Sequence, residues 1–260
     1  MICALMLDLD DSPDFPGSDG QALGRPLAAY PFMAARSTGD IRRYYVVTGT
    51  PAVKAVALQN NAAIIDPAPA PNGSLGAAAE TQLRHGFKFA AEELKADKET
   101  LDLLVVFFSN APCLTGASLQ AGLDAMQARP ELDSAVTVSP MPRWNPFFAR
   151  RESEKGLLEP YVDAPPAARG EPLYPDYGAH LLRPRCLDGK GSGAPPCPWL
   201  GERALPLKQS GIGPVDYKWQ VPAAEYWLKH HGYSDISANY ELQPQPKLQQ
   251  QTKPQKTDRR

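Results

Sequence analysis

Hydrophobic and polar positions alternate along the first 140 residues in blocks of two kinds. The first kind is a short and almost continuous apolar run, which is typical of a strand buried on both faces of a sheet. Five such runs follow one another along the chain: ICALML, RYYVVTG, AAIID, DLLVVFF and SAVTV. Because LLVVFF has six apolar residues in succession, we expect it to form a central strand.

The second kind of block has helical spacing. One helix is predicted over residues 26–38, with Pro26 near its first position, where proline is favoured. Another is predicted over 74–94, capped by Asn72 or Ser74. Its apolar stripe consists of Leu75, Ala79, Leu83, Phe87, Ala90 and Leu94. A third helix, over 115–128, brings together Leu119, Leu123 and Met126.

Strands that alternate with helices predict an α/β fold with a mostly parallel sheet and right-handed crossovers. In open sheets of this kind, ligands bind beyond the carboxyl ends of the strands. The sequence therefore predicts a site built from residues 8–19, 48–50 and 109–113.

Composition changes this picture mainly in the C-terminal half. Proline accounts for 28 of the 260 residues, about twice its usual share of roughly 5%. Since much of it lies between residues 140 and 222, we expect that region to be rich in loops. Residues 243–260 are rich in glutamine, lysine and proline and contain one apolar side chain, Leu248, which predicts a disordered tail after a domain that spans 1–235.

Charge and hydropathy exclude two classes of function. The tail holds five of the 27 basic residues and one of the 29 acidic ones, so the remaining body carries 22 bases and 28 acids, a net charge of −6. Such a body is not expected to bind nucleic acid. No apolar run approaches the roughly 18 residues of a membrane span, and MICALMLDLDD lacks the features of a signal peptide, so we expect a cytoplasmic protein.

The four cysteines are dispersed. Only Cys186 and Cys197 lie near each other, and this spacing is poor for zinc. We expect all four to be reduced packing residues.

Several segments lie between and after the strands in a recognisable order. They are GRPLAAYPFMAARS, TPAVKAVALQNNAAIIDPAP, TQLRHGF, WNPFFARR and the closing PWLGERALPLKQSGIGPVDYKWQVPAAEYWLKHHGY. In this order the chain resembles the cytidylyltransferases that make CMP-sugars, the acylneuraminate cytidylyltransferase family, over residues 1–235. The resemblance implies a three-layer Rossmann-like nucleotidyltransferase fold with a mostly parallel mixed sheet. It also implies a homodimer, whose subunit-facing and sugar-facing loops come from 140–222.

The implied reaction joins CTP and a nonulosonic or related sugar acid into a CMP-sugar, with Mg²⁺ present and pyrophosphate as the leaving group. The resemblance places nucleotide contacts at Ser12, Gly17 and Asn110. It places Mg²⁺ on Asp216 and on Asp10 or its neighbour Asp11.

Substrate binding is expected from a pair of arginines. Arg150 and Arg151 close the strand-like FFARR and could grip the carboxylate of the sugar acid in a bidentate manner. A solvated pair on the surface is the alternative.

Several basic positions of the family are not basic in this chain. The family has an arginine soon after the first strand, where this chain has Asp8 or Leu9. It has a lysine and an asparagine after the turn of the loop, where this chain has Ser18 and Asp19. Its arginine-proline pair after the third strand is Asp66-Pro67 here, and only one carboxylate of its Asp-x-Asp remains.

These replacements matter because nucleotidyl transfer depends on cations that neutralise phosphates. They leave open a second hypothesis, a pseudoenzyme that keeps the fold for binding or dimerisation. In that case Asn110 could be a turn former, and Asp216 could pair with Lys218 at the surface.

A minor alternative comes from MLDLDDSPD, which imitates the strand-Asp-x-Asp motif of haloacid-dehalogenase-type phosphatases. It would make Asp8 a nucleophile and Asp10 an acid/base, with Mg²⁺ bound and Thr48 in the second motif. Against it, no later pair of aspartates follows an apolar strand.

Overall fold

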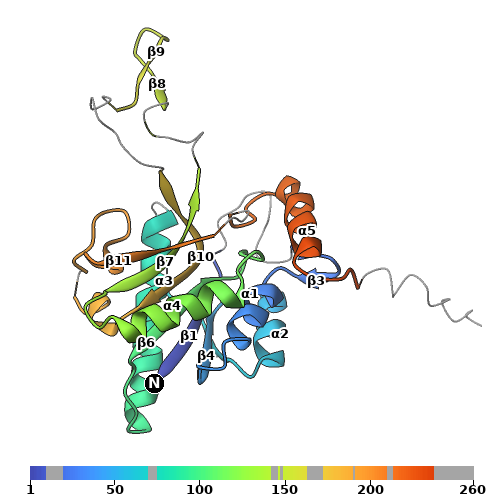
Figure 1. Ribbon diagram of the computed structural model, residues 1–260, viewed down its shortest axis with the longest axis vertical. Helices are drawn as coiled ribbons and strands as arrows, with labels where there is room; N and C mark the ends of the chain where they lie inside the picture. The colour runs from blue at the N-terminus through green and yellow to red at the C-terminus, as the bar shows by residue number, and fades with distance from the viewer. Residues whose placement is uncertain are drawn as a thin grey trace, which may run out of the picture.

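A computed structural model describes residues 1–9, 20–69, 75–141, 146, 149–162, 172–189, 191–209 and 213–236, although not the side chains of residues 75 and 76. The centre of the molecule is a seven-stranded sheet in the order β11-β7-β10-β6-β1-β4-β5 (Figure 1). Its strands are β1 (Ile2–Leu7), β4 (Arg43–Val47), β5 (Ala63–Ile65), β6 (Leu103–Phe108), β7 (Ser134–Pro140), β10 (Leu173–Leu182) and β11 (Ala204–Lys208).

The directions of the strands match the expected mostly parallel sheet. β10 runs antiparallel to its neighbours β6 and β7, and the other strand pairs of this sheet are parallel. The sheet is therefore mixed and mostly parallel, which confirms the predicted fold class. β1 lies between β4 and β6, and it pairs with β6 along its whole length, from Ile2 opposite Leu103 to Leu7 opposite Phe108.

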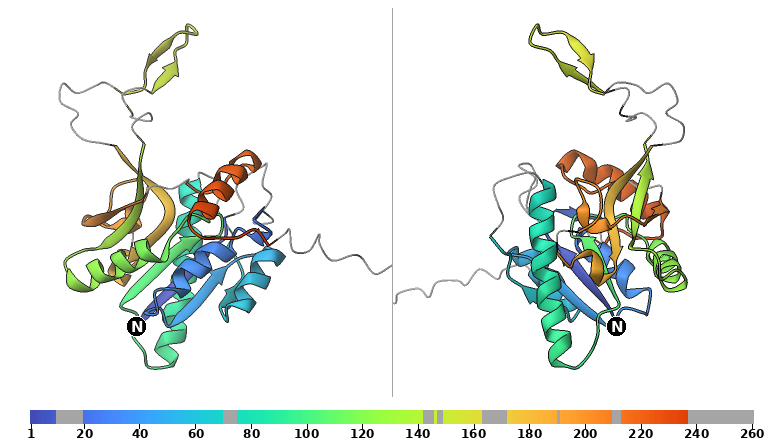
Figure 2. Two further views of the ribbon diagram at one scale, coloured as in Figure 1. Left: turned by 45° about the vertical axis from the view of Figure 1, so that its right-hand side comes forward. Right: turned by 90° about the vertical axis from the view of Figure 1, so that its left-hand side faces the viewer.

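Helices cover both faces of the sheet and make three layers (Figure 2). One face packs against α1 (Ala29–Arg36), α2 (Pro51–Gln59) and α4 (Gly116–Ala128), whose contributions to the core include Phe32, Val53 and Leu119. The other face packs against α3 (Leu75–Ala96) through Leu83, Ala90 and Leu94. Apolar runs such as LLVVFF are buried throughout because each of their faces meets a helical layer.

A smaller apolar cluster lies beside this core. The last helix, α5 (Val221–His230), contributes Ala224 and Leu228, which pack with Tyr30 of α1 and with Leu23 in the turn between β2 (Gln21–Ala22) and β3 (Arg25–Pro26). Proline lies in the first turn of this helix, and Gly232 follows its end with a φ of 87°.

A hairpin formed by β8 (Arg150–Glu152) and β9 (Leu158–Pro160) stands clear of the body in each view (Figures 1 and 2). Each residue of its two strands is exposed. Three-residue strands with no layer against them bury no core, so the position of the hairpin is not fixed by packing on the described part of its own chain.

The five predicted strands are present. The helix expected over 26–38 begins only at Ala29, because Pro26 lies in the short strand β3 and is not the helix opener. The Pro-rich region 140–222 contains β10 and β11 in addition to loops. The possible caps Asn72 and Ser74, and the tail 243–260, lie outside the described residues. No helix in the described part of the chain is long and apolar enough to cross a membrane.

Candidate functional site

Three strand ends meet around one carboxylate at the carboxyl edge of the sheet. Asp8 follows β1, and its Oδ2 accepts a hydrogen bond of 2.6 Å from Thr48 Oγ1 after β4. Its Oδ1 accepts one of 2.7 Å from Ser109 Oγ after β6. Strand register produces this arrangement, because Leu7 pairs with both Val47 and Phe108. Each polar residue therefore follows its own strand at the same level.

Neutral hydroxyl groups hold Asp8 in this arrangement. Thr48 Oγ1 also accepts a hydrogen bond of 3.0 Å from the backbone N–H of Thr50, which begins the turn into α2. Asp8 is thus fixed in place without a hydrogen bond or ion pair to a cation among the described side chains.

The next residue along this edge contacts the closing segment of the chain. Asn110 Nδ2 donates a hydrogen bond of 3.0 Å to Asp216 Oδ1, and the Asn110 carbonyl accepts one of 2.8 Å from the N–H of Val215. Gln220 holds the same turn from the other side, because its Oε1 accepts the backbone N–H groups of Asp216 and Tyr217, each at 2.7 Å. Buried Val215 anchors the turn in the cluster under α5. Two predicted site residues, Asn110 and Asp216, are therefore in contact.

The end of β5 adds a second carboxylate to the edge. Asp66 is almost fully exposed, and Lys54 of α2 lies 3.2 Å from its Oδ1. The Asp66 carbonyl is 3.0 Å from Nε2 of His85 on α3, which gives that histidine a structural partner. Nearby, Gln82 fixes the loop by bonding both backbone groups of Ala68, at 2.9 and 2.7 Å.

A polar cluster that the sequence did not reveal lies at the same edge, where β7, β10 and β11 meet. Buried Asp176 accepts hydrogen bonds from Ser139 Oγ at 2.7 Å, Gln209 Nε2 at 2.9 Å and the N–H of Gly178 at 3.1 Å. The pairing of β10 with β7 shifts register here, and Tyr177 has a φ of +49°. Proline and glycine inside a strand pattern, as in YPDYG, are the signal that could have indicated this bulge.

Gly178 is required by this cluster. A Cβ atom there would lie 2.8 Å from Gln209 Nε2 and 2.9 Å from Thr137 Oγ1. A side chain at this position would therefore displace Gln209, which bonds Asp176, and Thr137, which bonds the backbone of Ala179.

On the opposite face of β10, His180 is fully buried between Phe108, Tyr177 and Trp199. Burial lowers the pKa of its imidazole from 6.5 to about 4, and the nearby charge of Asp176 only partly offsets this. Trp199 Nε1 is 3.5 Å from His180 Nδ1, whereas His180 Nε2 has no hydrogen-bond partner in the described part of the molecule. The histidine is therefore neutral at physiological pH.

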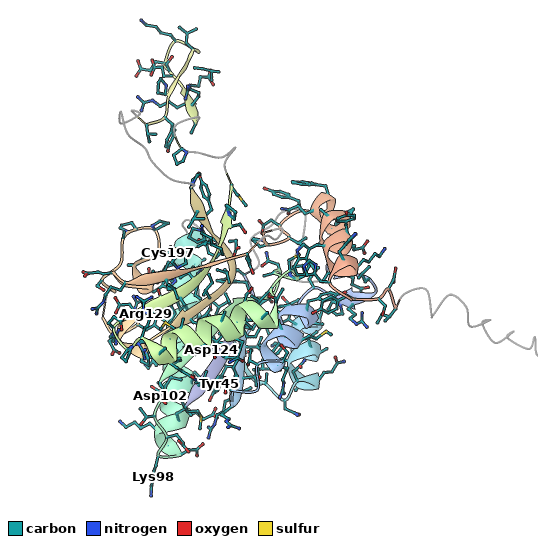
Figure 3. All side chains as sticks on the ribbon, in the orientation of Figure 1. Tyr45, Lys98, Asp102, Asp124, Arg129 and Cys197 are labelled. Atoms are coloured by element: carbon teal, nitrogen blue, oxygen red, sulfur yellow. The ribbon has the colours of Figure 1, made fainter. Side chains whose placement is uncertain are left out.

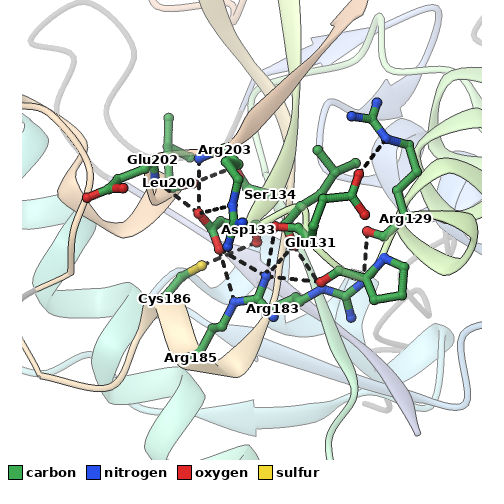
Figure 4. Close-up of polar contacts among 12 residues, drawn as sticks. Arg129, Glu131, Asp133, Ser134, Arg183, Arg185, Cys186, Leu200, Glu202 and Arg203 are labelled. Carbon is green, nitrogen blue, oxygen red and sulfur yellow. Dashed lines mark hydrogen bonds and ion pairs between the residues drawn. The ribbon is translucent and has the colours of Figure 1, made fainter.

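The opposite, amino edge of the sheet carries a dense polar network centred on Asp133, just before β7 (Figure 4). Arg185 lies 2.9 Å from its Oδ1, and Oδ2 accepts the backbone N–H groups of Glu202 and Arg203 at 3.1 and 3.0 Å. These bonds outweigh the effect of burial and lower the pKa of the Asp133 carboxyl. This network ties together the start of β7, the end of β10 and the start of β11, so it holds three strands in place at the edge opposite Asp8.

The remaining predicted residues are elsewhere. Ser12, Gly17, Asp10 and the neighbouring Asp11 lie outside the described residues. Arg150 and Arg151 lie on the projecting hairpin and are exposed, with Arg151 3.8 Å from Glu159 across the hairpin. The described chain does not bring them together with Asn110 and Asp216, and their role in binding a carboxylate stays a prediction.

The four cysteines are buried and free, as expected. Within the described ranges, no group of three or more histidine, cysteine, aspartate and glutamate side chains could hold a metal ion. Of the residues expected to hold Mg²⁺, the structure describes Asp216, and its role in binding a metal stays a prediction.

Comparison with known proteins supports the fold through structure and not through sequence. No family model matches this sequence, and no curated protein matches it. A solved CMP:2-keto-3-deoxy-manno-octonic acid synthetase, in complex with CTP, is similar in structure with a TM-score of 0.60. The alignment covers 88% of this chain and 99% of that one at 13% identity.

A second similar structure is the 4-diphosphocytidyl-2C-methyl-D-erythritol synthase from Anaerococcus prevotii. It has a TM-score of 0.57, and the alignment covers 88% of this chain and 98% of that one at 10% identity. The chain therefore has the fold of these cytidylyltransferases over nearly their whole length.

Proposed function

We propose that this protein is a cytidylyltransferase-like enzyme that joins CTP and a sugar acid into a CMP-sugar and pyrophosphate. The contact between Asn110 and Asp216 carries this proposal. It brings the turn after a central strand and the closing segment together at the carboxyl edge, where ligands of such sheets bind. The fold shared with a synthetase solved in complex with CTP supports the same nucleotide here.

Oxygen donors at this edge fit Mg²⁺, which prefers carboxylate oxygens and substrate phosphates. Asp216 would hold the ion together with Asp10, which the resemblance assigns to the same role. When bound, the ion would supply positive charge against the triphosphate. Asn110 would orient Asp216 through its amide N–H, and its carbonyl would keep the closing turn at the edge.

A titration with CTP and Mg²⁺ tests the nucleotide assignment. At a ligand concentration 1,000-fold above Kd, binding should stabilise the fold by about 4 kcal/mol and raise Tm. The isosteric change Asp216→Asn should weaken this effect at least tenfold in Kd. The matched control is Asp124→Asn on the outer side of α4, where Asp124 accepts a bond from Gln120 (Figure 3). Equal binding by both variants would remove Asp216 from the site.

A pseudoenzyme is the second candidate, and the charge of the edge favours it. Asp66, and Asp8 or its neighbour Leu9, stand where the family that the sequence resembles has arginines, and Asp8 is held in place by Thr48 and Ser109. At 4 Å and an effective dielectric constant near 20, one unit-charge contact is worth up to about 4 kcal/mol, so replacing attraction by repulsion weakens triphosphate binding. Pyrophosphate release with a panel of sugar acids separates the two candidates. Binding without release would identify a pseudoenzyme.

The homodimer is part of the same proposal. The projecting hairpin exposes large apolar side chains that the described part of its own chain does not cover, which favours a partner subunit. Light scattering coupled to size-exclusion chromatography should report a mass near twice 28.3 kDa.

A further inference from the structure

The turn between β2 and β3 has a backbone conformation that its own residues do not favour. Leu23 and Gly24 form its centre, with φ values of +50° and +76°. Two consecutive residues with positive φ are typical of a type I′ turn, which prefers asparagine followed by glycine and not leucine. Leu23 is only 1% exposed and packs with Ala224 and Leu228 of α5. Contacts from outside the turn therefore hold it in this conformation.

These contacts come from the closing segment, defined here as residues 213–236. Glu225 of α5 lies 202 positions from Leu23, and its Oε1 accepts a hydrogen bond of 3.0 Å from the Leu23 N–H. After the helix, the Ile236 N–H donates a bond of 3.1 Å to the Leu23 carbonyl. Arg25 Nη1 donates one of 2.9 Å to the carbonyl of Ser234. The closing segment thus satisfies both backbone groups of Leu23.

The same segment carries part of the candidate site at the start of α5. Gln220 holds the backbone N–H groups of Asp216 and Tyr217, each at 2.7 Å. Asp216 Oδ1 in turn accepts the bond from Asn110, whose carbonyl accepts the Val215 N–H. A helix is a rigid element that can transmit a displacement from one contact to another. The turn at Leu23 and the contact with Asn110 are therefore joined through α5, which lies beside β3 in Figure 1.

We propose that Glu225 is a positioning residue of the candidate site, because it holds α5 on the turn between β2 and β3 and thereby keeps Asp216 against Asn110. Its effect on a ligand rests on the proposed function, whereas its effect on the contact is a property of the free chain. Without an acceptor at Glu225, the buried Leu23 N–H loses its hydrogen bond, which costs more than the bond itself contributes. α5 and Asp216 are then held less firmly.

The turn requires a hydrogen-bond acceptor and not a charge, because the partner of Glu225 is a neutral N–H group. Glu225→Gln keeps an acceptor oxygen on a side chain of the same length. Glu225→Met removes the acceptor but keeps an unbranched side chain of good helix propensity. The matched control is Glu80→Met, since Glu80 is a half-buried glutamate of α3 that accepts a bond of 2.8 Å from Arg84.

Amide hydrogen exchange of the full-length protein without ligand is the first test. In Glu225→Met, the amides of Leu23, Val215 and Ile236 should exchange about tenfold faster than in the wild type, while those of β6, which report on global unfolding, keep their rates. Glu225→Gln should exchange like the wild type, and Glu80→Met should leave the Val215 amide unchanged. Faster exchange at Leu23 alone would overturn the proposal, and so would an equal acceleration in β6.

Calorimetric titration of the same variants with CTP and Mg²⁺ is the second test. We expect the Kd of Glu225→Met to rise about fivefold and that of Glu225→Gln to stay at the wild-type value. If Glu225 acts through Asp216, the double variant Asp216→Asn with Glu225→Met should bind no more weakly than Asp216→Asn alone. Multiplied effects in the double variant would overturn the positioning role. A wild type that does not bind CTP would refute the proposed function, and hydrogen exchange would then decide on Glu225 by itself.

Discussion

Asp8 and Asp133 are two carboxylates at opposite edges of one sheet, and their surroundings differ in kind. Asp133, at the amino edge, is held by arginine and by backbone N–H groups, and the pKa of its carboxyl is lowered. Asp8, at the carboxyl edge, accepts hydrogen bonds from two neutral hydroxyl groups. The Asp133 carboxylate is thus paired with a cation of its own chain, whereas the Asp8 carboxylate has no cationic partner among the described residues.

Removing each carboxylate in turn tests whether the two edges of the sheet differ in stability. Asp133→Ala should lower the free energy of unfolding by about 3–5 kcal/mol, because it leaves Arg185 and two backbone N–H groups without their partner. Asp8→Ala should cost only about 1–2 kcal/mol, since the groups it leaves are neutral hydroxyls. Urea unfolding measures both, and equal losses would show that the two edges do not differ.

A glycine pair tests how tightly the amino edge is packed. A Cβ atom at Gly201, whose φ is +73°, would lie 2.4 Å from the Cβ of Asp133. Gly201→Ala should therefore destabilise the fold by about 3 kcal/mol, through backbone strain and overpacking together. Gly39 has nearly the same φ, +75°, with nothing within 4 Å, so Gly39→Ala should cost only about 1 kcal/mol. Thermal unfolding measures both variants, and equal Tm values would contradict the close packing around Gly201.

Acid should act on two groups over different pH ranges. Burial lowers the pKa of His180 to about 4, so the unfolded chain takes up a proton before the folded one as pH falls below 6.5. At pH 4.5 this should cost about 2.5 kcal/mol of stability. The lowered pKa of Asp133 has a different range, because its contribution is complete above about pH 4 and is lost only as pH falls further.

Urea unfolding at pH 7 and pH 4.5 measures this difference. The free energy of unfolding of the wild type should decrease by the full amount between these two pH values. In His180→Phe, about 2.5 kcal/mol of this decrease should be absent. The same pH dependence in both proteins would assign the decrease to other groups.

Hydrophobic patterning predicted most of the fold, and the reasons for its failures are local. Continuous apolar runs gave the five strands because both faces of those strands are covered. β10 was missed since Pro175 and Gly178 interrupt its pattern, and these lie at the bulge near Asp176. β11 contains Pro206, which is tolerated because this strand is at the edge of the sheet.

The candidate site was predictable in part. The rule that ligands bind at the carboxyl ends of strands correctly brought Thr48 and Ser109 to one edge. The partners of Asp133 carried no local signal, since Arg185 and Arg203 are separated from it by 52 and 70 positions in the sequence. The contact between Asn110 and Asp216 spans 106 positions, and only the order of segments suggested that both belong to one site.

The smallest expected effect concerns the charge of the carboxyl edge. If the protein binds CTP as proposed, Asp66→Arg replaces an exposed carboxylate at the end of β5 by the cation found there in the family that the sequence resembles, so CTP affinity should rise about fivefold, or about 1 kcal/mol for one contact in water-like surroundings. Asp66→Asn should give about half of this free energy, because it only removes repulsion. Glu202→Arg, at the exposed amino edge, is the control, since it changes the net charge equally but far from the strand ends. Calorimetric titration at two salt concentrations measures the three variants, and the gain for Asp66→Arg should shrink as salt increases. An equal gain for Glu202→Arg would mean that CTP senses only net charge, and it would remove the distinction between the two edges that the carboxylates suggest.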